Sequence, residues 1–300
     1  MAHKTLIGGT AYNISGGKSL VSGTSYNIKG GKTLVGGTGY SISFSSGEPT
    51  AMLYSDGDFV FQHGSEVASG KTLTASYTGF EDTTYGSQAS VPWNSNMGSI
   101  KRVSFNNEIK PISLAHWFYN ARNMTSFDWT NLNMYNITNM RGTYYNCPNL
   151  TGSPVCGEKV TNMAYAYYNC CNLTGNPVCG NKVTNMYYAY RNCTNLTGSP
   201  VCGNNVTNMA WTYYNCKNLN AGTFYFYSKN VTDARNCFYG KNNSRRYNIH
   251  VPANSTTFNT FIINNTRRSL VGATITWINN GTCWYNPKYN IYIYANTSMA

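Results

Sequence analysis

Charge is scarce in this chain of 300 residues. Only 11% of the residues are charged, ten of them are acidic, and there are four histidines. No carboxylate stands at a catalytic spacing from a His, Cys or Lys, and acid–base or nucleophilic chemistry needs such groups together. We therefore predict that the protein is not an enzyme and has no catalytic residue and no cofactor.

Long hydrophobic runs are also lacking. No stretch of 18 apolar residues occurs, so we expect no membrane insertion. The N-terminal sequence MAHKTLIGGTAYNISGG has no apolar core of the kind found in secretory signals. We expect a protein that acts outside a cell either to have lost such a signal or to leave by another route, such as virion assembly followed by lysis.

Cysteine is abundant, but the pairs that hold a metal are missing. None of the ten cysteines forms a C-x₂₋₄-C pair, and Asp56 with Asp58 offers too few oxygens for a calcium loop, so we predict no metal site. Seven cysteines form two ladders: Cys147, Cys170, Cys193 and Cys216, and Cys156, Cys179 and Cys202. Disulfides between stacked neighbours are geometrically possible, but we expect buried thiols that act as small hydrophobic groups.

Basic residues exceed acidic ones and give a net charge of +12, but they are scattered along the chain. A nucleic-acid binder would more often gather them on one element. We therefore expect solubility and a weak attraction to anionic surfaces, without a nucleic-acid partner.

The chain is dominated by a repeat of 23 residues. Three copies follow one another without a gap, at residues 147–169, 170–192 and 193–215. Five apolar columns recur: Leu150, Leu173, Leu196 and Leu219; Val155, Val178 and Val201; Val160, Val183 and Val206; Met140, Met163, Met186 and Met209; Tyr144, Tyr167, Tyr190 and Tyr213. Such columns indicate stacked coils, because each inward residue must match those above and below it. The flanking steps are irregular, so we predict about five coils, three regular and two imperfect.

The pattern C-x-x-L-x(4)-P-V-x(4)-V-x-x-M-x(3)-Y-x-x-C resembles the BspA type, or Treponema type, of leucine-rich repeat. The phrases VTNM, YYNC and NLT are similar to the Asn-rich version in Mycoplasma lipoproteins, Firmicute surface proteins and some gut-phage tail proteins. The resemblance implies a leucine-rich-repeat solenoid. Pro154, Pro177 and Pro200 depart from it, and we expect a short or irregular sheet face because a central strand tolerates Pro poorly.

The expected fold is β-rich and has four parts. Residues 1–47 hold 14-residue repeats, each a short β-hairpin, that resemble the fibre-shaft repeats of viral attachment proteins and would serve attachment or oligomerisation. Residues 48–113 form a β-rich N-terminal cap with a type I′ turn at Asp56 and Gly57. Residues 114–245 form the solenoid, with a short helical turn over 161–169, and residues 246–300 form a C-terminal β cap.

Variable aromatic residues form two outward columns. One column contains Tyr165, Tyr188 and Trp211, and the other contains Tyr145, Tyr168, Arg191 and Tyr214, of which we take the last three as candidate recognition residues. A varied surface over a fixed core is how solenoids present binding faces. We predict that this recognition face stacks on sugar rings or on a partner protein. The alternative is that these residues pack within the coils or against a neighbouring protomer.

Three functions remain open. The first, which we favour, is a bacteriophage virion structural protein of the tail-fibre or receptor-binding type. It would form a homo-oligomer, with a trimer as one candidate, join other virion proteins and contact a host cell-surface glycan or protein. The second is a BspA-like adhesin on a bacterial cell surface. The third is a purely structural capsid or tail decoration protein.

Overall fold

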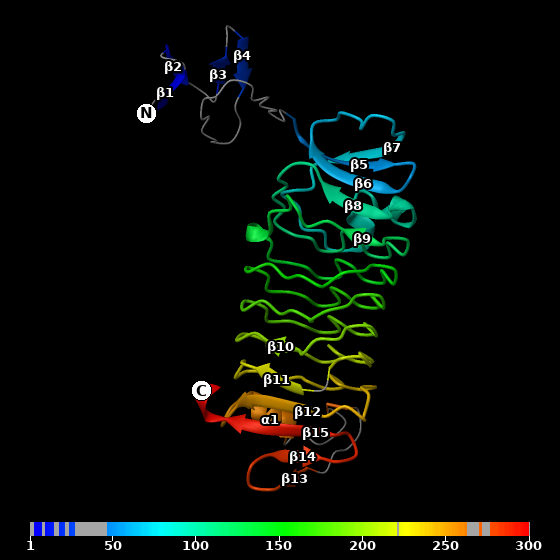
Figure 1. Cartoon of the computed structure of the whole chain (residues 1–300), viewed down its shortest axis with the longest axis vertical. Helices are drawn as coiled ribbons and strands as arrows, with labels where there is room; N and C mark the ends of the chain where they lie inside the picture. The colour runs from blue at the N-terminus through cyan, green and yellow to red at the C-terminus, as the bar shows by residue number, and fades with distance from the viewer. Residues whose placement is uncertain are drawn as a thin grey trace.

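The computed structural model is rich in β-structure (Figure 1). It describes residues 3–7, 10–14, 18–21, 24–27, 47–220, 222–262, 270–271 and 277–299. These ranges contain one α-helix, α1 (Thr256–Ile262), and four 3-10 helices, at Gln88–Ser90, Asn94–Ser99, Met134–Asn136 and Thr297–Met299. The prediction of a β-rich fold is confirmed.

Two hairpins stand at the N-terminus. β1 (His3–Ile7) pairs antiparallel with β2 (Thr10–Ile14), and β3 (Lys18–Val21) pairs antiparallel with β4 (Thr24–Asn27). The first two 14-residue repeats therefore have the strand pairing that their sequence predicts. The third repeat, at residues 32–44, lies outside the described residues.

The first mixed sheet has the strand order β7-β5-β6-β8-β9. Its strands are β5 (Pro49–Tyr54), β6 (Asp58–His63), β7 (Leu73–Thr78), β8 (Arg102–Phe105) and β9 (Ser126–Phe127). β5 pairs antiparallel with β6 and β7, whereas β6, β8 and β9 run parallel. The predicted type I′ turn is wrong. The loop has three residues, 55–57, and among them only Gly57 has a positive φ, of 92°. A three-residue hairpin loop needs just one residue in the left-handed region.

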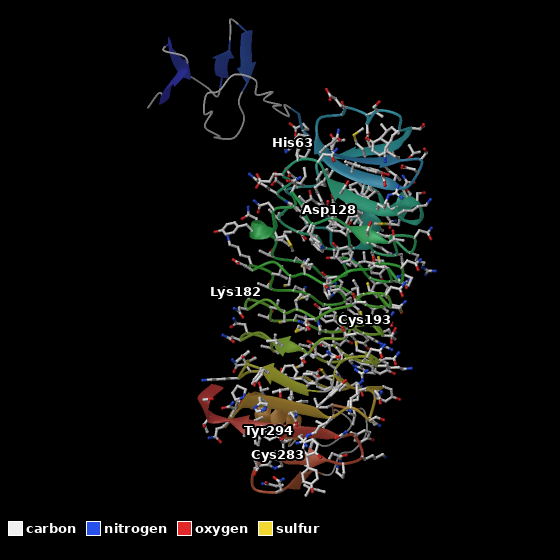
Figure 2. The ribbon with its side chains drawn as sticks, in the orientation of Figure 1. His63, Asp128, Lys182, Cys193, Cys283 and Tyr294 are labelled. Atoms are coloured by element: carbon white, nitrogen blue, oxygen red, sulfur yellow. The ribbon has the colours of Figure 1, made fainter. Side chains whose placement is uncertain are left out.

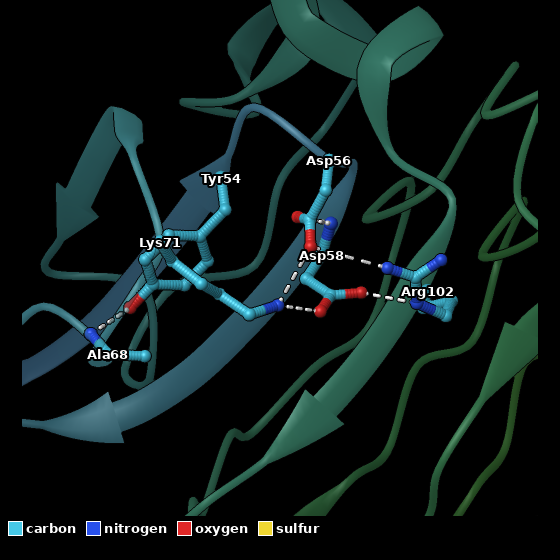
Figure 3. Close-up of polar contacts among 6 residues, drawn as sticks. All are labelled: Tyr54, Asp56, Asp58, Ala68, Lys71 and Arg102. Atoms are coloured by element: carbon cyan, nitrogen blue, oxygen red, sulfur yellow. Dashed lines mark hydrogen bonds and ion pairs between the residues drawn. The ribbon is translucent and has the colours of Figure 1, made fainter.

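Two cations neutralise the carboxylates of this loop (Figure 3). Lys71 lies 3.0 Å from Asp56 and also pairs with Asp58, and Arg102 Nε lies 2.5 Å from Asp58. Partial burial alone would raise the pKa of Asp58, but hydrogen bonds from Lys71 and Arg102 outweigh it and lower that pKa. The carboxylates thus hold β8 and the segment before β7 against the loop.

The second mixed sheet has the strand order β10-β11-β12-β15-β14-β13. Its strands are β10 (Val201–Cys202), β11 (Gly222–Phe226), β12 (Tyr247–Pro252), β13 (Ile278–Asn279), β14 (Trp284–Asn286) and β15 (Ile291–Asn296). The four strands β10, β11, β12 and β15 pair in parallel, whereas β14 pairs antiparallel with both β13 and β15. β15 is therefore paired on both sides within the chain, with β12 and with β14.

Between the two sheets the repeats lie one above another (Figure 1). A ladder of parallel bridges joins them through one residue per coil: Ser113, Asn139, Asn162, Asn185, Asn208 and Asp233. Each coil is thus hydrogen-bonded to the next. Residues 147–200 contain no assigned strand, which agrees with the short or irregular sheet expected from the prolines.

The predicted helical turn over residues 161–169 is wrong. The amides of Tyr165 and Tyr167 donate to carbonyls of the next coil at 2.9 and 2.8 Å, whereas those of Ala166 and Tyr168 donate to carbonyls three residues back. Tyr165 and Asn169 both have a φ of 60°, in the left-handed region. A right-handed helix cannot continue through such residues, so the segment forms successive turns that share half of their hydrogen bonds with the neighbouring coil.

One hydrophobic core runs from Ala51 to Ile293. The Leu, Met and Tyr columns and the column of Val160 are buried, as predicted. The prediction that the column of Val155 is buried is wrong. Val155 and Val178 are only partly buried, and Val201 is 42% exposed. Val201 pairs with Tyr225, and successive side chains of a strand point to opposite faces. The inner face of this sheet therefore belongs to neighbours such as Phe224 and Cys202.

Buried tyrosine hydroxyls replace strand pairing in the regular coils. The Tyr167 hydroxyl donates to the Val155 carbonyl at 2.7 Å and accepts from the Val155 amide at 3.1 Å. The next coil repeats both contacts at the same distances. In the coil after that, Val201 pairs with β11 instead, and the Tyr213 hydroxyl has no partner in the described part of the chain. The tyrosines therefore satisfy backbone groups that a sheet would otherwise use.

All ten cysteines are free thiols, and seven of them are buried. The Cys193 thiol donates to the Tyr167 carbonyl at 2.9 Å, and the same contact recurs in the next coil. Burial raises the pKa of Cys156 to about 11 and that of Cys179 to about 12. The cysteine ladders are thus composed of thiols that act as core side chains and weak hydrogen-bond donors.

Candidate recognition face

Six side chains, one per coil, form an outer column. They are Tyr119, Tyr145, Tyr168, Arg191, Tyr214 and Tyr239. The ring centroids of the first two lie 4.1 Å apart, those of Tyr145 and Tyr168 lie 4.5 Å apart, and those of Tyr214 and Tyr239 lie 4.7 Å apart. The interplanar angles are 5–7°. The rings stack in register because the backbone of each coil is hydrogen-bonded to the next.

An inner column of Tyr165, Tyr188 and Trp211 lies beside the outer one. Its rings also stack, with centroids 5.1 and 5.4 Å apart and interplanar angles of 19° and 9°. Tyr168 lies 6.1 Å from both tyrosines of this column, and Trp211 lies 5.1 Å from Tyr214. The two columns form one surface, the aromatic face, and it unites all six residues predicted from the sequence.

The inner column has an unusual backbone. The φ angle is 60° at Tyr165, 60° at Tyr188 and 62° at Trp211. The left-handed region costs about 1–2 kcal/mol for a residue with a Cβ, and a bulky residue there is an outlier. At the equivalent position of the flanking coils stand Gly142, with a φ of 59°, and Asn236, with a φ of 55°. Those residue types accept this conformation readily, so aromatic residues occupy the inner column against the local backbone preference.

Arg191 joins the two columns. Its guanidinium carbon lies 5.7 Å from the ring centroid of Tyr168, 5.0 Å from that of Tyr188, 5.1 Å from that of Trp211 and 4.5 Å from that of Tyr214. Cation–π attraction replaces the ring contact that a tyrosine would make at this level. The arginine therefore continues the outer column and adds a positive charge to the aromatic face.

The ring faces are covered, and the ring edges are partly exposed. All six predicted residues are partly buried, and the ring faces inside the columns lie against rings or guanidinium groups of neighbouring coils. Trp211 ends the inner column, and one of its faces stacks on Tyr188. The face-on stacking with sugar rings that we expected is therefore not open to rings inside the columns. A ligand would touch the edges and hydroxyl groups instead, so packing within the coils and recognition use different parts of the same side chains.

Four hydroxyl groups of the aromatic face have a raised pKa. Burial, together with the neighbouring Tyr145, raises the pKa of Tyr119 to about 12. Burial likewise raises the pKa of Tyr165, Tyr168 and Tyr188. At neutral pH these side chains are therefore uncharged hydrogen-bond donors.

Three members of this surface escaped the sequence prediction. Tyr119 and Tyr239 extend the outer column, and Tyr187 packs edge-on against Tyr188 with centroids 4.2 Å apart. The core columns step by 26 residues before the regular repeats and by 25 residues after them. The same steps from Tyr145 and Tyr214 lead to Tyr119 and Tyr239, so the sequence could have located both. Tyr187 had no such signal, because alanines hold its position in the adjacent coils.

Within the residues that the structure describes, no three His, Cys, Asp or Glu side chains lie close enough together to hold a metal ion. A search of the same residues for a helix long and apolar enough to cross a membrane finds none.

Comparisons with known proteins bear on the repeats alone. A family model described as "Mycoplasma protein of unknown function, DUF285" matches twice, at residues 112–199 and 155–253. The two matches overlap and together span just under half of the chain, including every member of the aromatic face. Neither the curated proteins nor the solved structures give a match.

Proposed function

We propose, taking the similarity of residues 112–253 to the DUF285 model as the premise, that the stacked repeats are a leucine-rich-repeat-like solenoid between two β caps, with the six levels of the bridge ladder where the sequence predicted about five coils. The constant period of 23 residues, the ladder of parallel bridges and the continuous core support this proposal. The likeness of the repeat to the BspA type supports it from the sequence.

The aromatic face is the surface by which this protein binds a host-surface ligand, a glycan or a protein, without catalysing a reaction. The observation that carries the proposal is the left-handed backbone of Tyr165, Tyr188 and Trp211. Bulky residues in costly conformations cluster at functional sites, where another gain offsets the strain. The same position holds Gly142 and Asn236 in the adjacent coils and His116, with a φ of 62°, in the coil before Gly142. These residue types adopt the conformation more readily than Tyr or Trp, so we attribute the aromatic choice to a benefit beyond folding.

We place the protein on a bacteriophage virion. The N-terminal hairpins support this, because hairpins of this length have little core of their own and gain stability from other chains. They would join copies of the chain into a homo-oligomer, a trimer being one candidate, and attach it to other virion proteins.

A BspA-like adhesin on a bacterial surface is the second candidate. The matching family model is described as a Mycoplasma protein, which favours a bacterial protein over a phage protein. Both candidates use the aromatic face in the same way, and they differ in whether the chain is recovered from purified virions or from a bacterial envelope.

The test is the double variant Tyr188→Asn with Trp211→Asn. Asn is the residue that the chain itself uses at the equivalent position 236. Loss of stacking costs about 0.5–1.5 kcal/mol per pair, and relief of the left-handed strain returns about 1–2 kcal/mol per residue. The two rings take part in five ring pairs, so the lost stacking outweighs the relieved strain. We therefore expect a fold that is retained, with a net loss of stability of about 1–3 kcal/mol. Aromatic anchors of a real interface contribute about 2 kcal/mol or more each, so binding should fall by a factor of about 30 or more for each residue lost.

Binding is measured by flow cytometry, with the fluorescently labelled full-length chain and a panel of intact bacterial isolates. Tyr135→Asn is the matched control, because Tyr135 is 61% exposed and lies outside the aromatic face. Unchanged cell binding by the double variant would refute the proposal. Unfolding of the double variant would show that the rings serve packing alone.

A further inference from the structure

The charge balance around the aromatic face is one-sided. Residues 114–245 contain ten Lys and Arg but only three acidic residues, Asp128, Glu158 and Asp233. Asp233 is paired with Arg235 at 2.9 Å. Arg141, whose guanidinium lies 5.4 Å from the ring of Tyr165, and Arg191 form no ion pair with the described residues. The aromatic face therefore carries unneutralised positive charge.

Stacking determines which part of each ring meets the solvent. An aromatic ring is electronegative over its faces and electropositive along its edge. In the aromatic face, the faces are used for ring–ring contacts and for Arg141 and Arg191, so the electropositive edges remain. The protonated hydroxyls at those edges are donors as well. Edges, hydroxyls and guanidinium groups all favour a negatively charged, acceptor-rich ligand.

The repetition of this surface indicates the shape of the ligand. The outer column presents a ring or a guanidinium in six successive coils, and adjacent ring centroids in it lie 4.1–4.7 Å apart. Such a surface offers the same contacts many times along one line. A linear polymer with a charge on each unit can occupy several levels at once, and linked contacts of this kind raise the overall affinity.

Nucleic acids are also linear polyanions, but the aromatic face suits them poorly. Proteins that bind single strands offer free aromatic faces on which bases stack, worth about 1–3 kcal/mol per base. Here the ring faces inside the columns are covered by neighbouring rings, and only the ring at the end of a column has a face without a stacked neighbour. The ligand that remains is a polymer without stacking bases.

We infer that the aromatic face binds a linear anionic polysaccharide, with carboxylate, sulfate or phosphate groups along its length, which lies parallel to the stacking direction of the coils. The inference rests on the proposed recognition function and specifies its ligand class.

Three polymers with one backbone test the charge requirement: dextran, carboxymethyl-dextran and dextran sulfate. We expect binding of the two charged polymers with affinity that increases with chain length, and at least a tenfold weaker binding of dextran. The carboxylate and sulfate arms distinguish the two anion chemistries. Oligothymidylate of matched charge should bind at least tenfold more weakly than the preferred dextran.

Charge-matched variants separate a built site from general attraction to a basic protein. Arg191→Gln and Lys182→Gln each remove one positive charge. Lys182 is exposed on the left of the stack in Figure 2, and among the described residues no ring lies within cation–π distance of it, whereas Arg191 lies over four rings. We expect a tenfold or larger loss of affinity for Arg191→Gln and less than a twofold loss for Lys182→Gln. Arg141→Gln, at an exposed edge, repeats the test without altering the centre of the stack.

Equal losses for the Arg and Lys variants would overturn the inference, as would equal binding of dextran or of oligothymidylate. The proposed function fails separately, through cell binding that survives loss of Tyr188 and Trp211. If cell binding is lost in that double variant while neutral dextran binds as well as the charged polymers, recognition stands and the anionic ligand is refuted.

Discussion

Replacement of Tyr190 by Phe removes one oxygen atom and two hydrogen bonds. The hydroxyl donates to the Val178 carbonyl at 2.7 Å and accepts from the Val178 amide at 3.1 Å. Tyr190 itself is fully buried, whereas Val178 is partly buried. The chain offers a matched control in Tyr213, which occupies the next level of the same column and whose buried hydroxyl has no partner among the described residues.

The magnitude follows from what each variant leaves behind. A typical hydrogen bond contributes about 0.5–1.5 kcal/mol net, and a buried group left unpaired costs about 1–3 kcal/mol. Tyr190→Phe leaves both the amide and the carbonyl of Val178 unpaired. Because Val178 is partly exposed, each group should cost about 1 kcal/mol, so we expect a loss of about 2 kcal/mol. Tyr213→Phe instead removes an unsatisfied polar atom, so it should be neutral or stabilising by up to about 1 kcal/mol. The two variants should therefore differ by about 2–3 kcal/mol although they delete the same atom.

Urea denaturation followed by tryptophan fluorescence measures the difference. We expect the transition midpoint of Tyr190→Phe to shift down and that of Tyr213→Phe to stay or shift up, with an unchanged m-value. Equal shifts for the two variants would refute the view that tyrosine hydroxyls replace strand pairing in the regular coils. Tyr167→Phe should behave as Tyr190→Phe does, because it has the same two contacts.

Two further predictions concern the core. Leu173→Asp places an unpaired charge at a site that is 1% exposed, and that burial is costly. The cooperative unfolding of the stack should be lost, whereas the exposed neighbour Thr174→Asp should melt as the parent does; similar melting of both would contradict the columnar core. The second of these predictions concerns the thiols. Burial raises their pKa above the ordinary 9.0, to about 11 for Cys156 and about 12 for Cys179. Above pH 9.0 the unfolded chain therefore releases protons that the folded chain keeps, and the free energy of unfolding should fall as the pH rises from about 8 to about 10. Lys241, whose pKa burial lowers to about 8, contributes in the opposite direction. A flat or rising profile by urea titration would contradict the buried thiols.

The repeat itself determined much of the architecture. A residue such as Met163 or Leu173 must pack against the same residue type one coil above and one below, so a column that keeps its size and apolarity over 23-residue steps predicts the core. The outward aromatic columns could also be predicted from the repeat, because their residue types vary from coil to coil while the core positions stay constant. The 14-residue hairpin repeats and the likeness to a leucine-rich repeat likewise predicted a β-rich chain.

Other features depended on contacts between coils, which the sequence of one coil does not contain. Val201 points outward because pairing with Tyr225 sets its side of the sheet. The left-handed backbone of Tyr188 could not be predicted, because tyrosine normally avoids that conformation. It accompanies the hydrogen bond that the Tyr188 amide donates to the next coil at 3.1 Å. The coverage of the ring faces depends on the same register. The period determined which residues share a column, and the hydrogen bonds between coils decided which part of each side chain faces the solvent.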